Sequence, residues 1–358
     1  MTGRTPAAPA APGSAPFSPK DPDTPRDPPH DPNAPRTPGT PMPLYRSAPA
    51  RAAALASAVL LATACGPAEE EGRAGAPEVR IALNGWVGYQ ADAAVVSYLL
   101  EEELGYQVEL VEADEEASWR SLADGSVDVI LENWGHEDLM ELYGDSERPL
   151  VVDGGPTGND GRIGWYLPEY LVEEHPGIDT VDGLLGKEDL FAGDGGGPGR
   201  LLAADPSFVT QDQGMINHFG LDLEIEHAGT EEKQIERVRE AYEKEEPVLF
   251  YFYEPQWLFE DLDLVKVEFP EYMELCEIDP EDVGCDYPDY ELNKVFSTAF
   301  TETGGPAHEL IENWTWTNED QNKVARMIAE EGKEPEQAAR AWAEENPDVW
   351  RKWIPEGA

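Results

Sequence analysis

The stretch Val248-Leu-Phe-Tyr-Phe-Tyr-Glu-Pro-Gln-Trp-Leu-Phe259 is the part of the chain that says most about its fold. It opens with an apolar, aromatic run whose length and composition are typical of a buried strand. Pro255 ends that strand, and the residues after it predict the start of a helix. We therefore expect Tyr253 at the carboxyl end of a strand, the edge at which open α/β sheets bind small ligands.

Predicted strands and helices alternate on both sides of this stretch. Apolar runs predict strands at 79–83, 108–111, 127–131, 223–225 and 264–267. Amphipathic segments predict helices at 91–104, 115–122, 180–185, 208–219, 231–245, 306–313, 319–331 and 334–345. Glycine-rich loops are expected at 84–90 and 191–200. This order predicts an α/β fold of parallel strands with covering helices.

The segment after residue 77 is too long for one small core, so we expect two α/β lobes. Residues 78–160 would form the first part of lobe 1, and residues 161–290 would form lobe 2. Residues 291–358 would return to lobe 1, because the chain after the cysteine-containing loop is expected to be helical to its end.

The first 77 residues differ in composition from the rest of the chain. Residues 1–41 hold 13 of the 32 prolines and almost no large apolar side chains, which predicts disorder. Residues 42–64 have a basic start, a short apolar run and small residues, the pattern of an export signal. We expect Met42 to be the true start, 1–41 to be a misassigned extension and 65–77 to be a flexible tether.

The sequence Ala64-Cys65-Gly66 resembles the end of a bacterial lipoprotein signal, in which the cysteine is acylated and becomes the mature N-terminus. Leu61 stands four places before the cysteine, whereas the usual leucine stands three places before it. The resemblance implies a protein that is anchored to the cell membrane through a lipid on Cys65.

The chain is strongly acidic, with 74 Asp and Glu against 25 Lys and Arg and a formal net charge of −49. Such a surface repels nucleic acids and anionic membrane surfaces, which excludes both as partners. The acidity has two interpretations: simple solubility, or exposure to high salt, in which self-repulsion is screened. The second interpretation predicts that stability falls on desalting.

Cys276 and Cys285 remain once Cys65 is assigned to a lipid. In an exported protein an even remainder favours a disulfide, which here would close a small loop. Metal binding is disfavoured, because the six histidines show no close ligand spacing. The glycine-rich segment 193–199 lacks the ending of a phosphate loop and does not fit the dinucleotide spacing. We expect neither a metal nor a cofactor.

Aromatic residues recur at the ends of predicted strands. Trp86 follows the first strand, Trp134 follows the third, and Tyr253 ends the strand of the opening stretch. Phe208 precedes a predicted helix. Each residue alone is more often packing than site, but together they predict the walls of one cleft. Aromatic faces suit a quaternary ammonium group, which has no conventional hydrogen bond to donate.

Four motifs around these aromatics resemble the substrate-binding proteins of glycine betaine/choline-type ABC importers. The motifs are Asn84-Gly-Trp-Val-Gly-Tyr, Leu131-Glu-Asn-Trp, Asp205-Pro-Ser-Phe-Val-Thr and Phe250-Tyr-Phe-Tyr-Glu-Pro-Gln-Trp. The resemblance implies a two-lobed, type II venus-flytrap fold with two interlobe crossings. It also implies an extracytoplasmic protein that closes on its ligand, docks on a membrane permease and catalyses no reaction. We expect this protein to be a monomer.

The resemblance assigns Trp134, Tyr253 and Phe208 to the aromatic box around a trimethylammonium group. Phe208 and Tyr253 stand where the best-known members have tryptophan, which is the strongest partner for a cation. A lower affinity or a different preferred ligand is the expected consequence. Trp86 matches a loop of this subgroup and is a further candidate for ligand contact.

The other end of the ligand requires polar partners. For a betaine carboxylate, the backbone N–H groups of Val209 and Thr210 are candidates, because they lie near a predicted helix N-terminus. His136 is a further candidate, although a solvent-facing position at a helix start explains it equally well. For choline, Asp212 or Glu254 would meet the hydroxyl group or the positive charge.

The sequence thus predicts a solute-binding protein for glycine betaine or a related quaternary ammonium osmoprotectant. The first alternative is the same fold specific for choline, carnitine or proline betaine. An enzyme that uses the cleft is disfavoured, because the chain has no Gly-x-Ser-x-Gly elbow or zinc motif. A sensor domain is disfavoured, because no kinase or transmembrane segment is attached.

Overall fold

The computed structural model describes residues 76–193 and 195–357, within the compact unit Ala68–Ala358. The predicted extension at 1–41, the predicted export signal at 42–64 and Cys65 lie outside the described residues. Among the described residues, no helix has both the length and the apolar character that are needed to cross a membrane.

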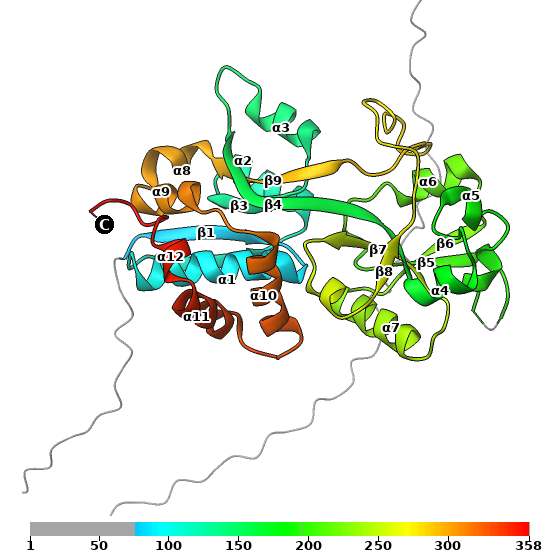
Figure 1. The fold of residues 1–358 in the computed structure, drawn as a ribbon. Coiled ribbons are helices and arrows are strands. Elements are labelled where there is room, and N and C mark those ends of the chain that lie inside the picture. The colour runs from blue at the N-terminus through cyan, green and yellow to red at the C-terminus, as the bar shows by residue number, and fades with distance from the viewer. Residues whose placement is uncertain (1–75, 194, 358) are drawn as a thin grey trace, which may run out of the picture. The chain divides into compact units, whose positions relative to one another are not determined.

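A nine-stranded mixed sheet forms the framework of the described residues (Figure 1). Its strands lie in the order β2-β1-β3-β9-β4-β7-β5-β6, and β8 pairs with β4 outside this path. Their bounds are β1 (Glu78–Leu83), β2 (Gln107–Glu112), β3 (Val129–Asn133), β4 (Val151–Pro168), β5 (Gly199–Ala203), β6 (Leu223–His227), β7 (Leu249–Glu254), β8 (Leu264–Lys266) and β9 (Asp289–Ser297).

Helices flank this sheet, and α10 and α11 both pack against α1. The helices that precede β9 are α1 (Val87–Glu102), α2 (Glu115–Asp124), α3 (Glu137–Gly144), α4 (Glu169–Glu174), α5 (Val181–Leu184), η1 (Glu188–Phe191), α6 (Asp212–Phe219), α7 (Glu231–Glu243) and η2 (Trp257–Glu260). The helices that follow it are α8 (Thr298–Thr303), α9 (Pro306–Asn313), α10 (Asn318–Ala329), α11 (Pro335–Glu345) and α12 (Pro347–Trp350).

Parallel strands form both ends of the sheet, as the alternating pattern predicts. β1 pairs in parallel with β2 and β3, and β5 pairs in parallel with β6 and β7. Between these ends, β4 and β9 run antiparallel to each other. β4 takes the chain from the first end to the second, and β9 brings it back (Figure 1). The result is a two-lobed fold with two crossings. We call the part built on β1, β2, β3 and β9 the first lobe, and the part built on β5, β6, β7 and β8 the second lobe.

Several elements differ from the sequence expectations. The sheet is mixed, because β4 and β9 are antiparallel. The chain after the cysteine-containing loop is not helical throughout, because β9 comes first. Polar residues within β9, such as Lys294, are buried, so its sequence lacks the apolar pattern that predicts a buried strand. β5 begins inside the expected loop 191–200. α1 begins at Val87, inside the expected loop 84–90, and α6 begins only at Asp212.

Side-chain caps fix the first turns of the helices that border the cleft described below. The carboxylate of Asp114 accepts the N–H of Ala117 at 2.7 Å, at the start of α2. The hydroxyl of Thr230 accepts a backbone N–H at the start of α7 in the same way. The residues that follow these caps, Glu115 and Glu231, are therefore held at defined positions.

The five tryptophans of the C-terminal segment pack in the core. They are all buried: Trp314, Trp316, Trp342, Trp350 and Trp353.

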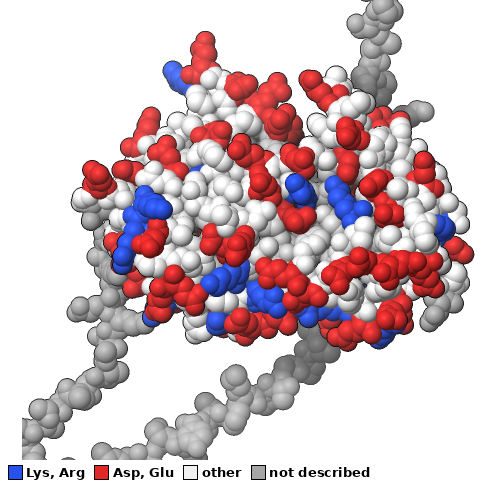
Figure 2. All heavy atoms as spheres, viewed as in Figure 1, with Lys and Arg blue, Asp and Glu red and all other residues white. Residues whose placement is uncertain are grey.

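The surface differs in character from this core. Figure 2 shows acidic side chains across the visible face, with far fewer basic ones between them. The high negative charge of the chain is thus carried on its surface.

Candidate binding site

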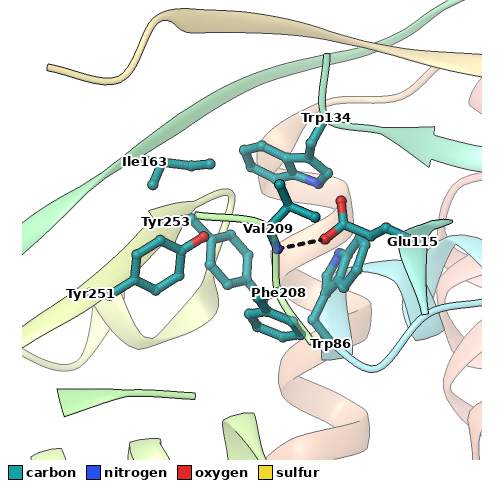
Figure 3. Close-up of a pocket in the computed structure, with 8 residues that line it drawn as sticks. All are labelled: Trp86, Glu115, Trp134, Ile163, Phe208, Val209, Tyr251 and Tyr253. Carbon is teal, nitrogen blue, oxygen red and sulfur yellow. Dashed lines mark hydrogen bonds between the residues drawn. The ribbon is translucent and has the colours of Figure 1, made fainter. Parts of the chain in front are cut away.

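A cleft of about 330 Å³ of empty space, partly open to solvent, is lined mainly by aromatic rings (Figure 3). No lysine or arginine is among its lining residues. These are Trp86, Glu115, Trp134, Ile163, Phe208, Val209, Tyr251 and Tyr253. We call the five aromatic residues of this set the aromatic cage. Such a lining offers ring faces to a cation and places no positive charge against it.

Most of the aromatic residues of the cleft lie at the ends of strands or at the starts of helices. Trp86 follows β1 and is the N-cap residue of α1, and Trp134 directly follows β3. Tyr253 lies near the end of β7. Phe208 lies in the segment between β5 and α6. The rings meet edge to face, with Trp134 and Tyr253 at 5.5 Å and Trp86 and Phe208 at 5.7 Å between centroids.

A buried carboxylate, Glu132, fixes the orientation of both tryptophans. Glu132 lies in β3 and is 2% exposed. Its Oε1 atom accepts hydrogen bonds from the indole N–H groups of Trp86 and Trp134, each at 2.7 Å. A buried indole N–H needs an acceptor, and here one carboxylate oxygen satisfies both rings and ties them to each other.

An amide network behind Glu132 joins it to α10. Gln321 donates to the second oxygen of Glu132 at 2.5 Å and accepts from Asn159 at 2.9 Å. Gly88 permits this approach, because a Cβ there would lie 2.8 Å from the Gln321 amide nitrogen. Asp92 lies in the same layer, where burial and the charge of Glu132 raise its pKa well above the usual range. Burial therefore favours the protonated form of Asp92.

A second buried carboxylate, Glu231 in the first turn of α7, holds the ring of Tyr253. It accepts hydrogen bonds from the Tyr253 hydroxyl and, at 2.6 Å, from the side-chain amide of Gln256. Its other oxygen accepts the backbone N–H of Val87 at 2.8 Å, at the start of α1 in the first lobe. Burial raises the pKa of Glu231 to about 7. Glu231 therefore connects the two lobes next to the aromatic cage.

A third carboxylate, Glu115, lines the cleft and also connects the lobes. Its Oε1 atom accepts the backbone N–H of Val209 at 3.2 Å (Figure 3). Its Oε2 atom lies 2.7 Å from Nε2 of His136. Burial lowers the pKa of His136, but the hydrogen bond and the charge of Glu115 outweigh this and raise it above its usual value. The His136 imidazole is thus held by its hydrogen bond to Glu115.

The structure brings five of the sequence-predicted candidates together in this cleft: Trp86, Trp134, Phe208, Val209 and Tyr253. The remaining candidates are not among its lining residues. His136 lines a neighbouring cavity, and Thr210 precedes α6. Asp212 is fully buried, and its Oδ1 atom accepts hydrogen bonds from an indole and a phenol group. Glu254 is the last residue of β7.

Sequence reasoning missed Tyr251, Glu115 and the carboxylates behind the cage. Tyr251 had a signal, because it stands two residues before Tyr253 and side chains two apart in a strand share a face. Glu132 had the same signal, two residues before Trp134. Nothing in the sequence distinguishes Glu115 or Glu231 from the other acidic residues of this chain.

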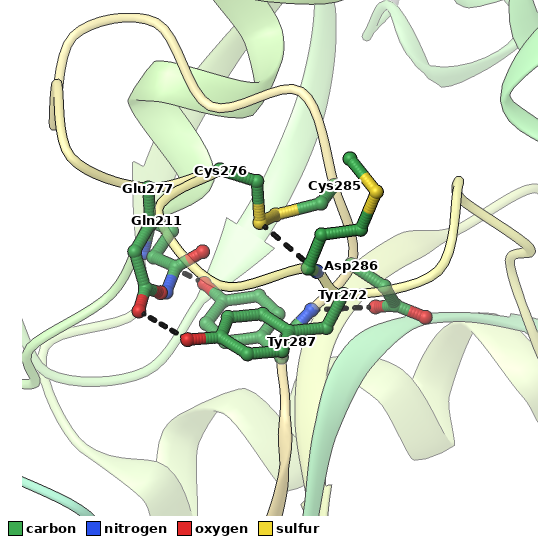
Figure 4. Close-up of a disulfide and its surroundings, with 8 residues drawn as sticks. Gln211, Tyr272, Cys276, Glu277, Cys285, Asp286 and Tyr287 are labelled. Carbon is green, nitrogen blue, oxygen red and sulfur yellow. Dashed lines mark hydrogen bonds between the residues drawn. A yellow bond between two sulfur atoms is a disulfide. The ribbon is translucent and has the colours of Figure 1, made fainter.

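A disulfide joins Cys276 and Cys285 in the second lobe, as the cysteine count predicts (Figure 4). The loop that it closes contacts the segment that carries Phe208 and Val209 toward α6. Gln211 in that segment donates its backbone N–H to the Tyr287 hydroxyl at 2.8 Å and its side-chain amide to Glu277 (Figure 4). The disulfide loop therefore supports one wall of the cleft from behind.

The chain matches a protein-family model over residues 77–345, described as the substrate binding domain of ABC-type glycine betaine transport systems. One similar protein is the glycine betaine/carnitine transport binding protein GbuC of Listeria monocytogenes, 26% identical over 117 residues. That match spans 32% of this chain and about one third (34%) of the relative. Another is the trimethylamine N-oxide-binding protein of Pelagibacter ubique, 22% identical over 284 residues, which cover 75% of this chain and 88% of the relative.

Solved structures share the fold. Lactococcal OpuAC in its closed form with glycine betaine superposes with a TM-score of 0.62 at 19% identity, over 78% of this chain and 100% of that structure. An ABC-transporter choline-binding protein in complex with choline also gives 0.62 at 19% identity, over 77% and 91%. With the family model spanning most of its length, the chain belongs to the family of substrate-binding domains of ABC-type glycine betaine transport systems.

Proposed function

We propose that this protein captures a quaternary ammonium compound between the rings of the aromatic cage and delivers it to the permease of an ABC importer. The aromatic lining of the cleft, with no basic residue in it, is the observation that carries the proposal. Trp86, Trp134, Phe208 and Tyr253 supply ring faces, each worth about 0.5–2 kcal/mol to a cation. Family and fold are those of a substrate-binding protein, and the protein itself catalyses no step.

Glycine betaine is the first candidate ligand. Its carboxylate would take the backbone N–H of Val209, and Thr210 or His136 would add a second donor. This geometry requires the N–H of Val209 to leave the Glu115 carboxylate, which now accepts it. The names of the similar proteins add carnitine and trimethylamine N-oxide as ligands of the same chemical class, and proline betaine belongs to it as well.

Choline is the second candidate, and one observation favours it. Glu115 lines the cleft and has one oxygen on Val209 and the other on His136. Two carboxylates repel each other in a cleft, whereas a hydroxyl group donates to a carboxylate. A ligand with a hydroxyl group in place of a carboxylate would therefore fit beside Glu115 without displacing its partners.

Parallel calorimetric titrations of the purified protein in high salt with glycine betaine and choline test the function. Tight binding of glycine betaine and weak binding of choline would establish an osmoprotectant receptor. The reverse would establish a choline receptor, as expected if Glu115 accepts the hydroxyl group. Failure of both ligands and of trimethylamine N-oxide to bind would reject the proposed ligand class.

Substrate-binding proteins of ABC importers work outside the cytoplasm, and we propose the same location for this one. Its anchor would be a lipid on Cys65 after removal of the signal at 42–64, and the mature protein would be a monomer. We also propose that the lobes are divided near 160/161 and 290/291, positions that fall inside β4 and β9. Intact-mass measurement of the mature protein tests the lipid, and loss of stability on desalting tests adaptation to high salt.

A further inference from the structure

Glu132 has an unusual set of partners for a buried carboxylate. Its oxygens accept two indole N–H groups and one amide N–H, and none of these donors carries a positive charge. Burial of a charge is costly unless hydrogen bonds compensate it. Both indoles belong to the aromatic cage, and both bind the same oxygen atom. The position of this charge is therefore linked directly to the ligand cleft.

A carboxylate on an indole N–H does more than fix the ring. Charge-assisted hydrogen bonds are stronger than neutral ones, and a chain of such bonds polarises its members. Negative charge at the N–H edge makes the π face richer in electrons. That face attracts a cation through its negative quadrupole, but it gains nothing for a neutral molecule of equal shape.

We propose that Glu132, which lies behind the aromatic cage, is a residue that determines the specificity of the cage. It acts through Trp86 and Trp134. Its carboxylate holds the two indoles at a fixed spacing and makes both rings better hosts for a cation than for a neutral isostere. The inference rests on the proposed function, and it adds a residue that does not itself touch the ligand.

The test compares a cation with its neutral isostere. Choline and 3,3-dimethyl-1-butanol have the same shape. Glycine betaine and 3,3-dimethylbutanoate share a shape and a carboxylate, and they differ in the charge of the head group that the rings contact. In Glu132→Gln the side-chain oxygen remains as an acceptor for both indoles, but the charge is lost. We expect the affinity for the quaternary ammonium ligand to fall about tenfold, if each ring loses part of its cation attraction. The affinity for the isostere should stay within about twofold, since its attraction to the rings does not depend on charge.

The single variant has one defect of its own, because its new amide would face the amide nitrogen of Gln321. The double variant Glu132→Gln, Gln321→Glu removes that conflict. It keeps the buried net charge, both indole acceptors and an acceptor for the amide of Asn159. The negative charge is only moved away from the indoles, so we expect the same tenfold loss for the cation. Melting temperatures of both variants, without ligand, verify folding, and the double variant decides if the single one does not fold.

Each outcome is decisive. An equal loss for the cation and the isostere would mean that Glu132 only positions the rings, which overturns the inference. Wild-type affinity for the cation in the double variant, or in a folded Glu132→Gln protein, would overturn it as well. In these cases the wild type still binds quaternary ammonium ligands and the proposed function stands. If the wild type binds none of them, the proposed function fails and the inference falls with it.

Discussion

Two buried carboxylates support the aromatic cage, and they differ in where their partners lie. Glu132 receives its hydrogen bonds from Trp86 and Trp134 of the first lobe and from Gln321 in α10, which packs against α1 of that lobe. Glu231 receives hydrogen bonds from Tyr253 and Gln256 in the second lobe and from the N–H of Val87 in the first. One network is internal to a lobe, and the other bridges the lobes.

This difference in partners gives the two buried carboxylates different functions: Glu132 shapes the cage, and Glu231 acts on the contact between the lobes. If the lobes part, the bonds of Glu132 would stay intact, so Glu132 would shape the cage whether the cleft is open or closed. The bond from Glu231 to Val87 and the bond from Glu115 to Val209 would break. We therefore expect Glu231 and Glu115 to act on closure. Only the bridging pair is exposed to changes of solvent and pH when the lobes part.

The pH dependence of stability gives the largest expected effect. Burial raises the pKa of Glu231 to about 7, from 4.5. Between these values the folded protein holds a proton that the unfolded chain has released, so stability is full below about pH 4.5 and falls as pH rises to about 7. The loss is on the order of 3 kcal/mol. Urea unfolding of the wild type and of Glu231→Gln between pH 5 and 8 measures it.

The difference between the two proteins isolates Glu231, because other buried carboxyls such as Asp92 and Asp212 are present in both. The variant should show a flatter dependence of the unfolding free energy on pH. If the unfolding free energy depends on pH with the same slope in wild type and variant, Glu231 is not the group that titrates. The contrast drawn between Glu231 and Glu132 would then have no support.

The disulfide provides a reference for stability outside both carboxylate networks. Replacing Cys276 and Cys285 by Ser should lower the unfolding free energy by about 2–3 kcal/mol, because the loop between them is no longer constrained in the unfolded chain. The pH dependence due to Glu231 and the choice of ligand should not change. A shift in the affinity ratio of glycine betaine to choline would show that the loop controls the cleft wall and not stability alone.

Removal of a cage wall should weaken binding by one to two orders of magnitude. In Trp134→Ala a ring worth about 2 kcal/mol to a cation is lost, and Glu132 loses one of its two indole partners. Calorimetric titration with the ligand that the wild type binds measures the change. Unchanged affinity would exclude Trp134 from the cage.

Tyr253→Phe should give the smallest effect and serves as the matched control for ring loss. The ring remains in the cleft, and only the hydroxyl bond to Glu231 is removed. We expect a loss of stability of about 1 kcal/mol and less than about a threefold change in affinity. A loss of affinity as large as that in Trp134→Ala would mean that the hydrogen bond between Tyr253 and Glu231, and not the aromatic rings, dominates binding.

The sequence was sufficient to predict the strands β1, β2, β3, β6 and β7, the helices α9, α10 and α11 and four of the five aromatic positions of the cleft, whereas β5 begins in an expected loop. Trp86, Trp134 and Tyr253 could be placed because they stand at strand ends, and such ends converge in α/β folds. The crossing strand β9 was missed, because Lys294 and other polar residues within it are buried by tertiary packing. Lys294 is satisfied there by the carbonyl groups of Glu312 and Trp314, a solution that no local pattern reveals.

The carboxylates of the site were not predicted for a different reason, although Glu132 had the signal of its two-residue spacing from Trp134. Among 74 acidic residues, burial is what distinguishes Glu132 and Glu231, and burial depends on contacts between distant segments. Glu231 meets Val87 across 144 positions of the chain, and Gln321 meets Glu132 across 189. The polar candidates chosen from sequence, Asp212 among them, were selected by proximity along the chain.

A crystal structure of the protein with its bound quaternary ammonium ligand tests the central claim most directly. The account predicts the quaternary nitrogen within about 6 Å of the ring centroids of Trp86 and Trp134, with Glu132 still on both indole N–H groups. A ligand seated instead in the adjoining groove, which Asn84, Glu112 and Asp114 line together with Trp86 and Phe208, with its nitrogen well beyond that distance from Trp134, would contradict it.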